Sequence, residues 1–118
     1  MYFPALNTAI QHLEEKLFYD VALMYLSVLG YRELRMVDGS GDGGRDVICS
    51  RTDLRIQLSV RKDWENKIND EADTTANAGH HHLLYITNRP ITPDAEQGFL
   101  QSKFKHKGDV DVSIHMHV

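Results

Sequence analysis

Apolar residues recur along the first quarter of the chain at helical spacing. Between Thr8 and Leu29 they come three or four residues apart, which predicts a helix with one apolar face. Gly30 is a typical residue at a helix C-terminus. We therefore expect an N-terminal helix that packs against the rest of the protein through five side chains on one face: Leu13, Leu17, Val21, Met24 and Val28.

Three strands are predicted to follow this helix. Apolar residues alternate or run together over residues 31–37, 45–50 and 54–61, and a glycine-rich stretch separates the first two segments. Only three residues connect the last two segments, which makes them antiparallel neighbours. Side chains alternate between the faces of a strand, so the third segment has a polar face and an apolar face. The polar face carries Gln57, Ser59 and Arg61, and the apolar face carries Ile56, Leu58 and Val60.

The second half of the chain alternates between helices and strands. A helix is predicted over residues 64–77 with Asp63 as its cap, and an apolar strand over residues 82–87. Thr92 followed by Pro93 marks the start of a helix that runs to about residue 105. A fifth strand is indicated by the alternation of Val110, Val112 and Ile114. This order of elements predicts an α/β domain with a mixed sheet.

Length and composition limit the possible functions. The 118 residues suffice for one domain with its own core but not for two. The formal net charge of −4 argues against a broadly basic surface, so any contact with nucleic acid must be local. A single cysteine, Cys49, excludes an internal disulfide and fits a reducing compartment. No apolar run approaches the roughly 20 residues of a membrane span, and no signal peptide is indicated, so we expect a cytoplasmic protein.

Two polar residues on neighbouring strands form the candidate site. Asp46 follows the glycine-rich stretch, and Gln57 lies on the next strand at a comparable depth. A carboxylate and an amide oxygen placed side by side could hold a divalent cation. The alternative interpretations are a strand-edge acid paired with an arginine for Asp46 and a solvent-facing strand residue for Gln57. Asp42, within the glycine-rich stretch, is more typical of a turn residue than of a ligand.

Four short motifs follow one another along the chain. The segment 18–31, which spans most of the predicted first helix and its exit, ends in Leu29-Gly30-Tyr31, and residues 41–47 read Gly-Asp-Gly-Gly-Arg-Asp-Val. Residues 56–59 read Ile-Gln-Leu-Ser, and residues 85–88 read Tyr-Ile-Thr-Asn, followed by Ile-Thr-Pro-Asp-Ala at 91–95. In this order and spacing they resemble the Mrr-like branch of the PD-(D/E)XK, or restriction-endonuclease-like, nuclease superfamily. The resemblance covers almost the whole chain.

This resemblance implies both a fold and a metal-dependent chemistry. The fold would be an α/β restriction-endonuclease-like αβββαβ core, with a mixed central sheet flanked by helices and an additional helix and strand at the C-terminal end. Mg²⁺, for which Mn²⁺ would substitute, would serve phosphodiester hydrolysis. Asp46 would be its main ligand, Gln57 would replace a second carboxylate, and the backbone carbonyl of Leu58 could add a further oxygen. Because this set carries little negative charge, we expect modest metal affinity without DNA.

The chain departs from the family pattern at one position. Ser59 stands two residues after Gln57, where the family carries its catalytic lysine, and a serine cannot supply that positive charge. Catalytic lysines are known to migrate in this superfamily. We expect Lys67, one turn into the following helix, to take the role, with Lys62 and then Arg61 as alternatives. A further acid from the first helix is implied by the resemblance, and Glu15 is our choice over Glu14 and Asp20.

The leading hypothesis is a metal-dependent endonuclease domain that hydrolyses DNA. The resemblance implies a role as the effector of a prokaryotic restriction or antiviral defence protein. Two alternatives stay open: an RNA-directed nuclease, and a catalytically inactive binding or assembly module that lost its lysine at Ser59. We expect residues 1–118 to be one nuclease-like domain, the N-terminal module of a longer protein. Cutting both strands usually takes two sites, which suggests a homodimer or a larger assembly.

Overall fold

The structure, a computed structural model, describes residues 15–37, 44–105 and 110–115. Its five described strands form one sheet in the order β1-β2-β3-β4-β5, in which β1, β2 and β3 are antiparallel neighbours and β3, β4 and β5 are parallel. The mixed α/β sheet predicted from the sequence is confirmed. In chain order the elements are α2 (Glu15–Val28), β1 (Arg35–Val37), β2 (Gly44–Ile48), β3 (Leu54–Ser59), α3 (Trp64–Asn77), β4 (His82–Thr87), α4 (Pro93–Gly98), the π-helical η1 (Phe99–Lys103) and β5 (Asp111–His115).

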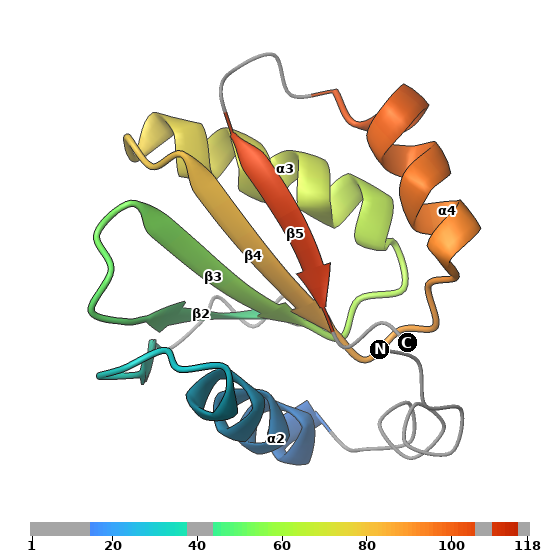
Figure 1. Ribbon diagram of the computed structural model, residues 1–118. Coiled ribbons are helices and arrows are strands. Elements are labelled where there is room, and N and C mark those ends of the chain that lie inside the picture. Colours follow the sequence, from blue (N-terminus) through green and yellow to red (C-terminus); the bar gives the residue numbers. More distant parts are fainter. Residues whose placement is uncertain (1–14, 38–43, 106–109, 116–118) are drawn as a thin grey trace.

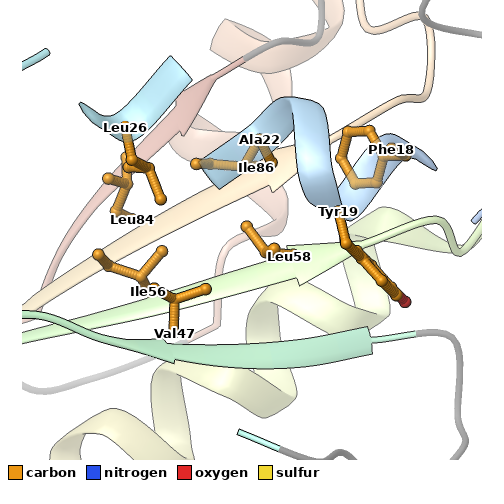
Figure 2. Packing of buried hydrophobic residues seen from close by; sticks show 9 residues of the cluster. All are labelled: Phe18, Tyr19, Ala22, Leu26, Val47, Ile56, Leu58, Leu84 and Ile86. Carbon is orange, nitrogen blue, oxygen red and sulfur yellow. The ribbon is translucent and has the colours of Figure 1, made fainter. Parts of the chain in front are cut away.

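Helices cover both faces of this sheet. Figure 1 shows α2 on one face, and α3 with α4 on the other. The α2 face holds a core in which Phe18, Tyr19, Ala22 and Leu26 of the helix meet Val47, Ile56, Leu58, Leu84 and Ile86 of three strands (Figure 2). The α3 face holds a second core, made by Ile68, Tyr85, Ile91, Phe99 and Ile114. The predicted division of the third strand holds, because Ile56 and Leu58 point to the α2 face, away from Gln57 and Ser59.

The predicted apolar face of the first helix is wrong at three of its four described positions, whereas the fourth, Val21, is half-buried and packs against the core. Leu17, Met24 and Val28 are 51%, 69% and 85% exposed, whereas the neighbouring stripe that begins at Phe18 and Tyr19 is buried. Helix α2 is apolar on nearly all sides, so two stripes at helical spacing compete for the sheet. Aromatic rings remove the most apolar area from water when buried, which favours the stripe that carries them. Leu13 lies outside the described residues, as does the predicted helix start at Thr8.

Most element boundaries agree with the pattern, and the differences have local causes. The first strand covers only residues 35–37 rather than 31–37, because Gly30 and Glu33 both have positive φ, which is incompatible with a continuous strand. Strands β2 and β3 each end two residues before their predicted ends at residues 50 and 61. Helix α3 matches its predicted range. The Thr92 hydroxyl caps α4 by accepting a hydrogen bond from the Ala95 amide.

Two leucines of α2, one buried and one exposed, allow the corrected helix face to be tested. Leu26→Ala removes a fully buried side chain, so we expect it to lower the free energy of unfolding by about 2–5 kcal/mol. Leu17→Ala makes the same chemical change at an exposed position of the same helix, and we expect a change within about 0.5 kcal/mol. Urea unfolding followed by circular dichroism measures both. A larger loss for Leu17→Ala than for Leu26→Ala would mean that the helix packs through the predicted stripe after all.

Candidate active site

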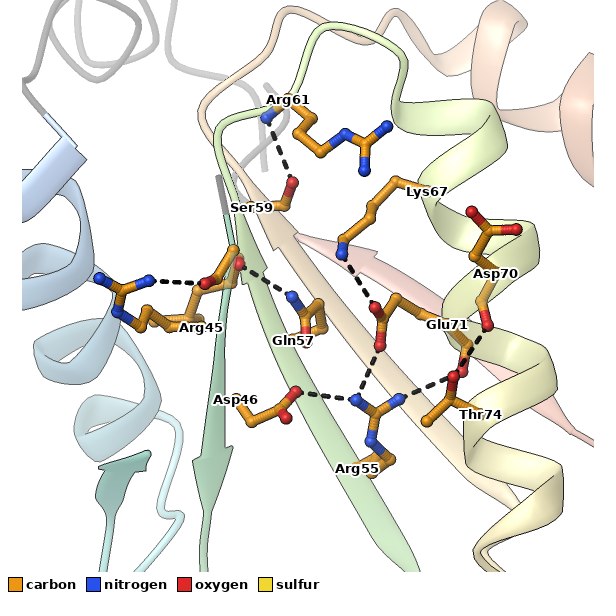
Figure 3. A network of polar contacts seen from close by, with 12 residues as sticks. Arg45, Asp46, Arg55, Gln57, Ser59, Arg61, Lys67, Asp70, Glu71 and Thr74 are labelled. Atoms are coloured by element: carbon orange, nitrogen blue, oxygen red, sulfur yellow. Dashed lines mark hydrogen bonds and ion pairs between the residues drawn. The ribbon is translucent and has the colours of Figure 1, made fainter. Parts of the chain in front are cut away.

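Asp46 and Gln57 lie directly opposite each other on β2 and β3. Directly opposite residues of an antiparallel pair project from the same face, here the one that α3 covers (Figure 3). The Asp46 side chain is half exposed, whereas Gln57 is buried. The structure therefore brings together the two side chains that the sequence predicts as metal ligands. Burial of Gln57 also rules out the interpretation of that residue as a solvent-facing strand position.

The backbone carbonyl of Leu58, the third predicted ligand, is close to the same place. It accepts a weak hydrogen bond of 3.4 Å from the side-chain amide nitrogen of Gln57. This contact uses the nitrogen of the Gln57 amide, which orients the side chain. The Leu58 side chain points the other way, into the core under α2. Its role as a metal ligand stays a prediction.

Arg55 joins the β2–β3 pair to α3. Its Nη2 lies 2.8 Å from Asp46 Oδ1 and 2.7 Å from Glu71 Oε2. Its Nη1 donates to the backbone carbonyl of Glu71 and to the Thr75 hydroxyl, both at 3.2 Å. The pairing of Asp46 with an arginine, one of the two interpretations of that residue, is thus present in the structure. It does not exclude the other, because half of the Asp46 side chain is open to solvent.

Lys67 reaches the same network from the first turns of α3. It is buried, only 4% exposed, and its Nζ lies 2.9 Å from Glu71 Oε1. Figure 3 shows its side chain running from the helix into the space beside β3. The position agrees with the prediction that a long side chain from this helix points back toward the site. Its catalytic role stays a prediction.

Glu71 is the residue that the sequence reasoning missed. It is buried and contacts both Lys67 and Arg55. Its Oε2 lies near Arg55 without the geometry of a hydrogen bond, so this buried oxygen has no hydrogen-bond donor among the described residues. The signal available in the sequence was the spacing of four from Lys67, which places an acid and a base side by side on a helix.

The two alternatives for the migrated lysine are Lys62 and Arg61. Lys62 is exposed in the loop before α3. Arg61 forms a two-point ion pair with Asp63, and these hydrogen bonds lower the pKa of the Asp63 carboxyl. Because the Asp63 side chain is engaged in this way, it makes no capping hydrogen bond to α3, contrary to its predicted role as a cap. Ser59 is fully buried, and its hydroxyl accepts a hydrogen bond from the Arg61 amide.

The predicted acid from the first helix is not brought to this group. Glu15 lies on α2, which covers the opposite face of the sheet, and its carboxylate accepts a hydrogen bond from the Tyr19 hydroxyl. Asp20 is on the same helix and exposed, while Glu14 and Asp42 lie outside the described residues. A catalytic role for Glu15 remains a prediction that these contacts do not support. Glu71 is the described helix acid that faces Asp46.

The oxygen atoms gathered on this face suit a hard cation such as Mg²⁺. Asp46 offers a half-exposed carboxylate, Gln57 an amide oxygen and Glu71 a buried oxygen without a hydrogen-bond donor. Mg²⁺ is commonly held by one or two carboxylates and keeps several waters. Among the described residues, no cluster of three or more His, Cys, Asp or Glu side chains is placed to hold an ion. A metal here would therefore depend on amide and water ligands as well as carboxylates.

Comparison with models of protein families assigns the chain to a family. Residues 10–106 match the family model Mrr_cat, described as restriction endonuclease. The chain belongs to this family of restriction endonucleases, as the four motifs indicate, and the class of protein is a nuclease. Comparisons with curated proteins and with solved structures gave no match. None of the helices within the described ranges is long and apolar enough to cross a membrane.

A double-mutant cycle tests whether Lys67 and Glu71 act as a buried pair. We expect Lys67→Met and Glu71→Gln each to lower the free energy of unfolding by about 3 kcal/mol, because each removes one partner of a buried ion pair. The double variant should lose about 2 kcal/mol less than the sum of the two. Lys103 and Glu65, 3.5 Å apart on the surface, provide the control, with an expected coupling below about 1 kcal/mol. Equal couplings for the two pairs would contradict the buried pairing.

Proposed function

We propose that this domain is a Mg²⁺-dependent endonuclease that hydrolyses phosphodiester bonds of DNA. The observation that carries the proposal is the convergence of Asp46, Gln57 and Lys67 on one face of the sheet from three separate elements. Membership in the restriction endonuclease family supports DNA as the substrate. We further propose a cytoplasmic role in prokaryotic restriction or antiviral defence, with a homodimer or a larger assembly providing two sites for cutting both strands.

Each residue of the site would have a distinct task. Asp46 and Gln57 would hold the metal ion, and the Leu58 carbonyl could contribute a further oxygen. When bound, the ion would make the attacking water more acidic and polarise the phosphoryl oxygens. The Lys67 ammonium would stabilise the negative charge that develops on the phosphoryl group. Glu71 would act as a positioning residue, because its ion pair with Lys67 keeps that side chain directed toward the sheet.

The charge balance of the site favours one alternative function. Arg55 and Lys67 match Asp46 and Glu71 in number, and the ion pairs among them link the four side chains into one chain of contacts. A charge-balanced network of this kind also stabilises the fold of a protein that has no catalytic activity. It is what we would expect of a non-catalytic member of the family that keeps the fold as a binding or assembly module. Activity assays separate the two functions.

Cleavage of a supercoiled plasmid in the presence of Mg²⁺ or Mn²⁺ tests the proposed catalytic residues. We expect Asp46→Ala and Lys67→Ala each to slow cleavage at least about 100-fold. The first would remove the main ligand of the metal ion, and the second would remove the positive charge that stabilises the transition state. Lys62→Ala, which removes an exposed neighbouring lysine, should cut at the wild-type rate. The opposite result for the two lysines would transfer the role to Lys62.

A rescue variant separates a catalytic from a structural loss at Lys67. Ser59→Lys places an ammonium group at the strand position where related nucleases carry theirs. In the Lys67→Ala background we expect it to restore part of the cleavage activity, with kcat recovering more than the thermal stability. Recovery of stability without activity would indicate a purely structural lysine. A wild-type domain that cuts nothing with either metal would favour the non-catalytic module.

Parallel assays on three substrates determine which type of nucleic acid the domain cleaves. We expect the wild-type domain to cleave duplex DNA in preference to single-stranded DNA and tRNA, because family membership favours DNA. Product formation is measured on denaturing gels at equal concentrations of phosphodiester bonds, with Asp46→Ala as the control for contaminating nucleases. Asp46-dependent cleavage of tRNA alone would identify an RNA-directed nuclease with the same site.

A further inference from the structure

We infer that Arg55 competes with the metal ion for Asp46 and thereby couples metal loading to nucleic-acid binding. The inference rests on the proposed function and concerns the regulation of the same site. Without substrate, the guanidinium of Arg55 would neutralise Asp46 and weaken metal binding. With substrate, a phosphate group would draw the guanidinium away and leave the carboxylate to the metal.

Most contacts of the Arg55 guanidinium are with α3 rather than with Asp46. Three of the four groups that its guanidinium contacts belong to α3: the backbone carbonyl of Glu71 and the hydroxyl of Thr75 accept hydrogen bonds, and the carboxylate of Glu71 forms an ion pair. Asp46 is the only one of the four on β2. The Arg55 side chain is 16% exposed, whereas that of Asp46 is 50% exposed. Arg55 can therefore give up Asp46 while its contacts with the helix are retained.

Electrostatics makes the ion pair an obstacle to metal binding. One oxygen of Asp46 is already 2.8 Å from a permanent cation, because an arginine does not lose its proton in proteins. A second cation at the same carboxylate meets repulsion in a partly buried place, where water screens it poorly. The predicted ligand set is weak even without this effect, since Gln57 and Leu58 contribute neutral oxygens. Arg55 weakens it further.

A phosphodiester has the charge and geometry to release this arrangement. Guanidinium groups bind phosphate oxygens through paired hydrogen bonds at least as well as they bind carboxylates. If Asp46 holds the catalytic metal ion, the phosphate that is cleaved must lie beside Asp46 and therefore near Arg55. Nucleic acid that engages Arg55 would raise the affinity for metal, and by reciprocity metal would raise the affinity for nucleic acid. The domain would then load its metal mainly on substrate.

Calorimetric titration with Mn²⁺ tests the coupling without relying on cleavage. Mn²⁺ is added to the protein alone and to its complex with a phosphorothioate duplex that resists hydrolysis. We expect the duplex to tighten Mn²⁺ binding to the wild type about tenfold. Arg55→Gln, which removes the charge, should bind Mn²⁺ about tenfold tighter than the wild type without DNA, and the duplex should add little. Arg55→Lys keeps the charge and should resemble the wild type.

Arg45→Gln is the matched control for net charge. Arg45 neighbours Asp46 in sequence but points to the other face, where its guanidinium lies 5.4 Å from the centre of the Tyr19 ring. We expect this variant to bind Mn²⁺ as the wild type does, with the same effect of the duplex. A gain equal to that of Arg55→Gln would show a general charge effect and overturn the inference. Unchanged or weaker Mn²⁺ binding by Arg55→Gln would also overturn it.

Asp46→Asn distinguishes a failure of this inference from a failure of the proposed function. Loss of Mn²⁺ binding in Asp46→Asn, together with no gain in Arg55→Gln, would overturn only the competition and leave the metal site in place. Mn²⁺ binding that is unaffected by Asp46→Asn would overturn the proposed metal site, and the competition with it. Thermal unfolding of each variant verifies that the proteins compared are folded.

Discussion

The antiparallel register of β2 and β3 is the constraint on which the site depends. It places Asp46 directly opposite Gln57 and, on the other face, Val47 opposite Ile56. Because strand side chains alternate, a slip of one residue would move Asp46 into the apolar core under α2. Burial of Val47, Ile56 and Leu58 therefore fixes the position of the two polar residues. The hydrophobic core under one face of the sheet thus fixes which polar side chains lie on the other face.

Helix α3 completes the site through charge rather than through apolar contact alone. It packs on the sheet with Ile68 and Ala72, and the same turns bring Lys67 and Glu71 to the polar face of β3. Buried charges are costly unless they are paired, and the contacts of Glu71 with Lys67 and Arg55 provide that pairing. The same side chains thus serve the fold and the proposed reaction.

Much of the fold could be predicted from the chain, because its helices and strands differ clearly in period. The range of α3 and that of β4 agree with the pattern, and so does the antiparallel pair β2–β3. The buried stripe of α2 could not be predicted correctly. Its apolar residues surround the helix, so spacing alone does not decide between Leu17 and Phe18. The shape of the sheet surface and the size of the aromatic rings make that choice.

The sequence by itself determined the family, the order of elements and the two strand residues of the candidate site. These follow from local patterns: alternation within a strand, glycines before Asp46 and the short turn between two strands. Only the tertiary structure decided which charges meet. Glu71 and Arg55 lie sixteen residues apart and on different elements, yet they contact each other because α3 folds back over β3. Such pairings depend on how an element docks, which no local pattern encodes.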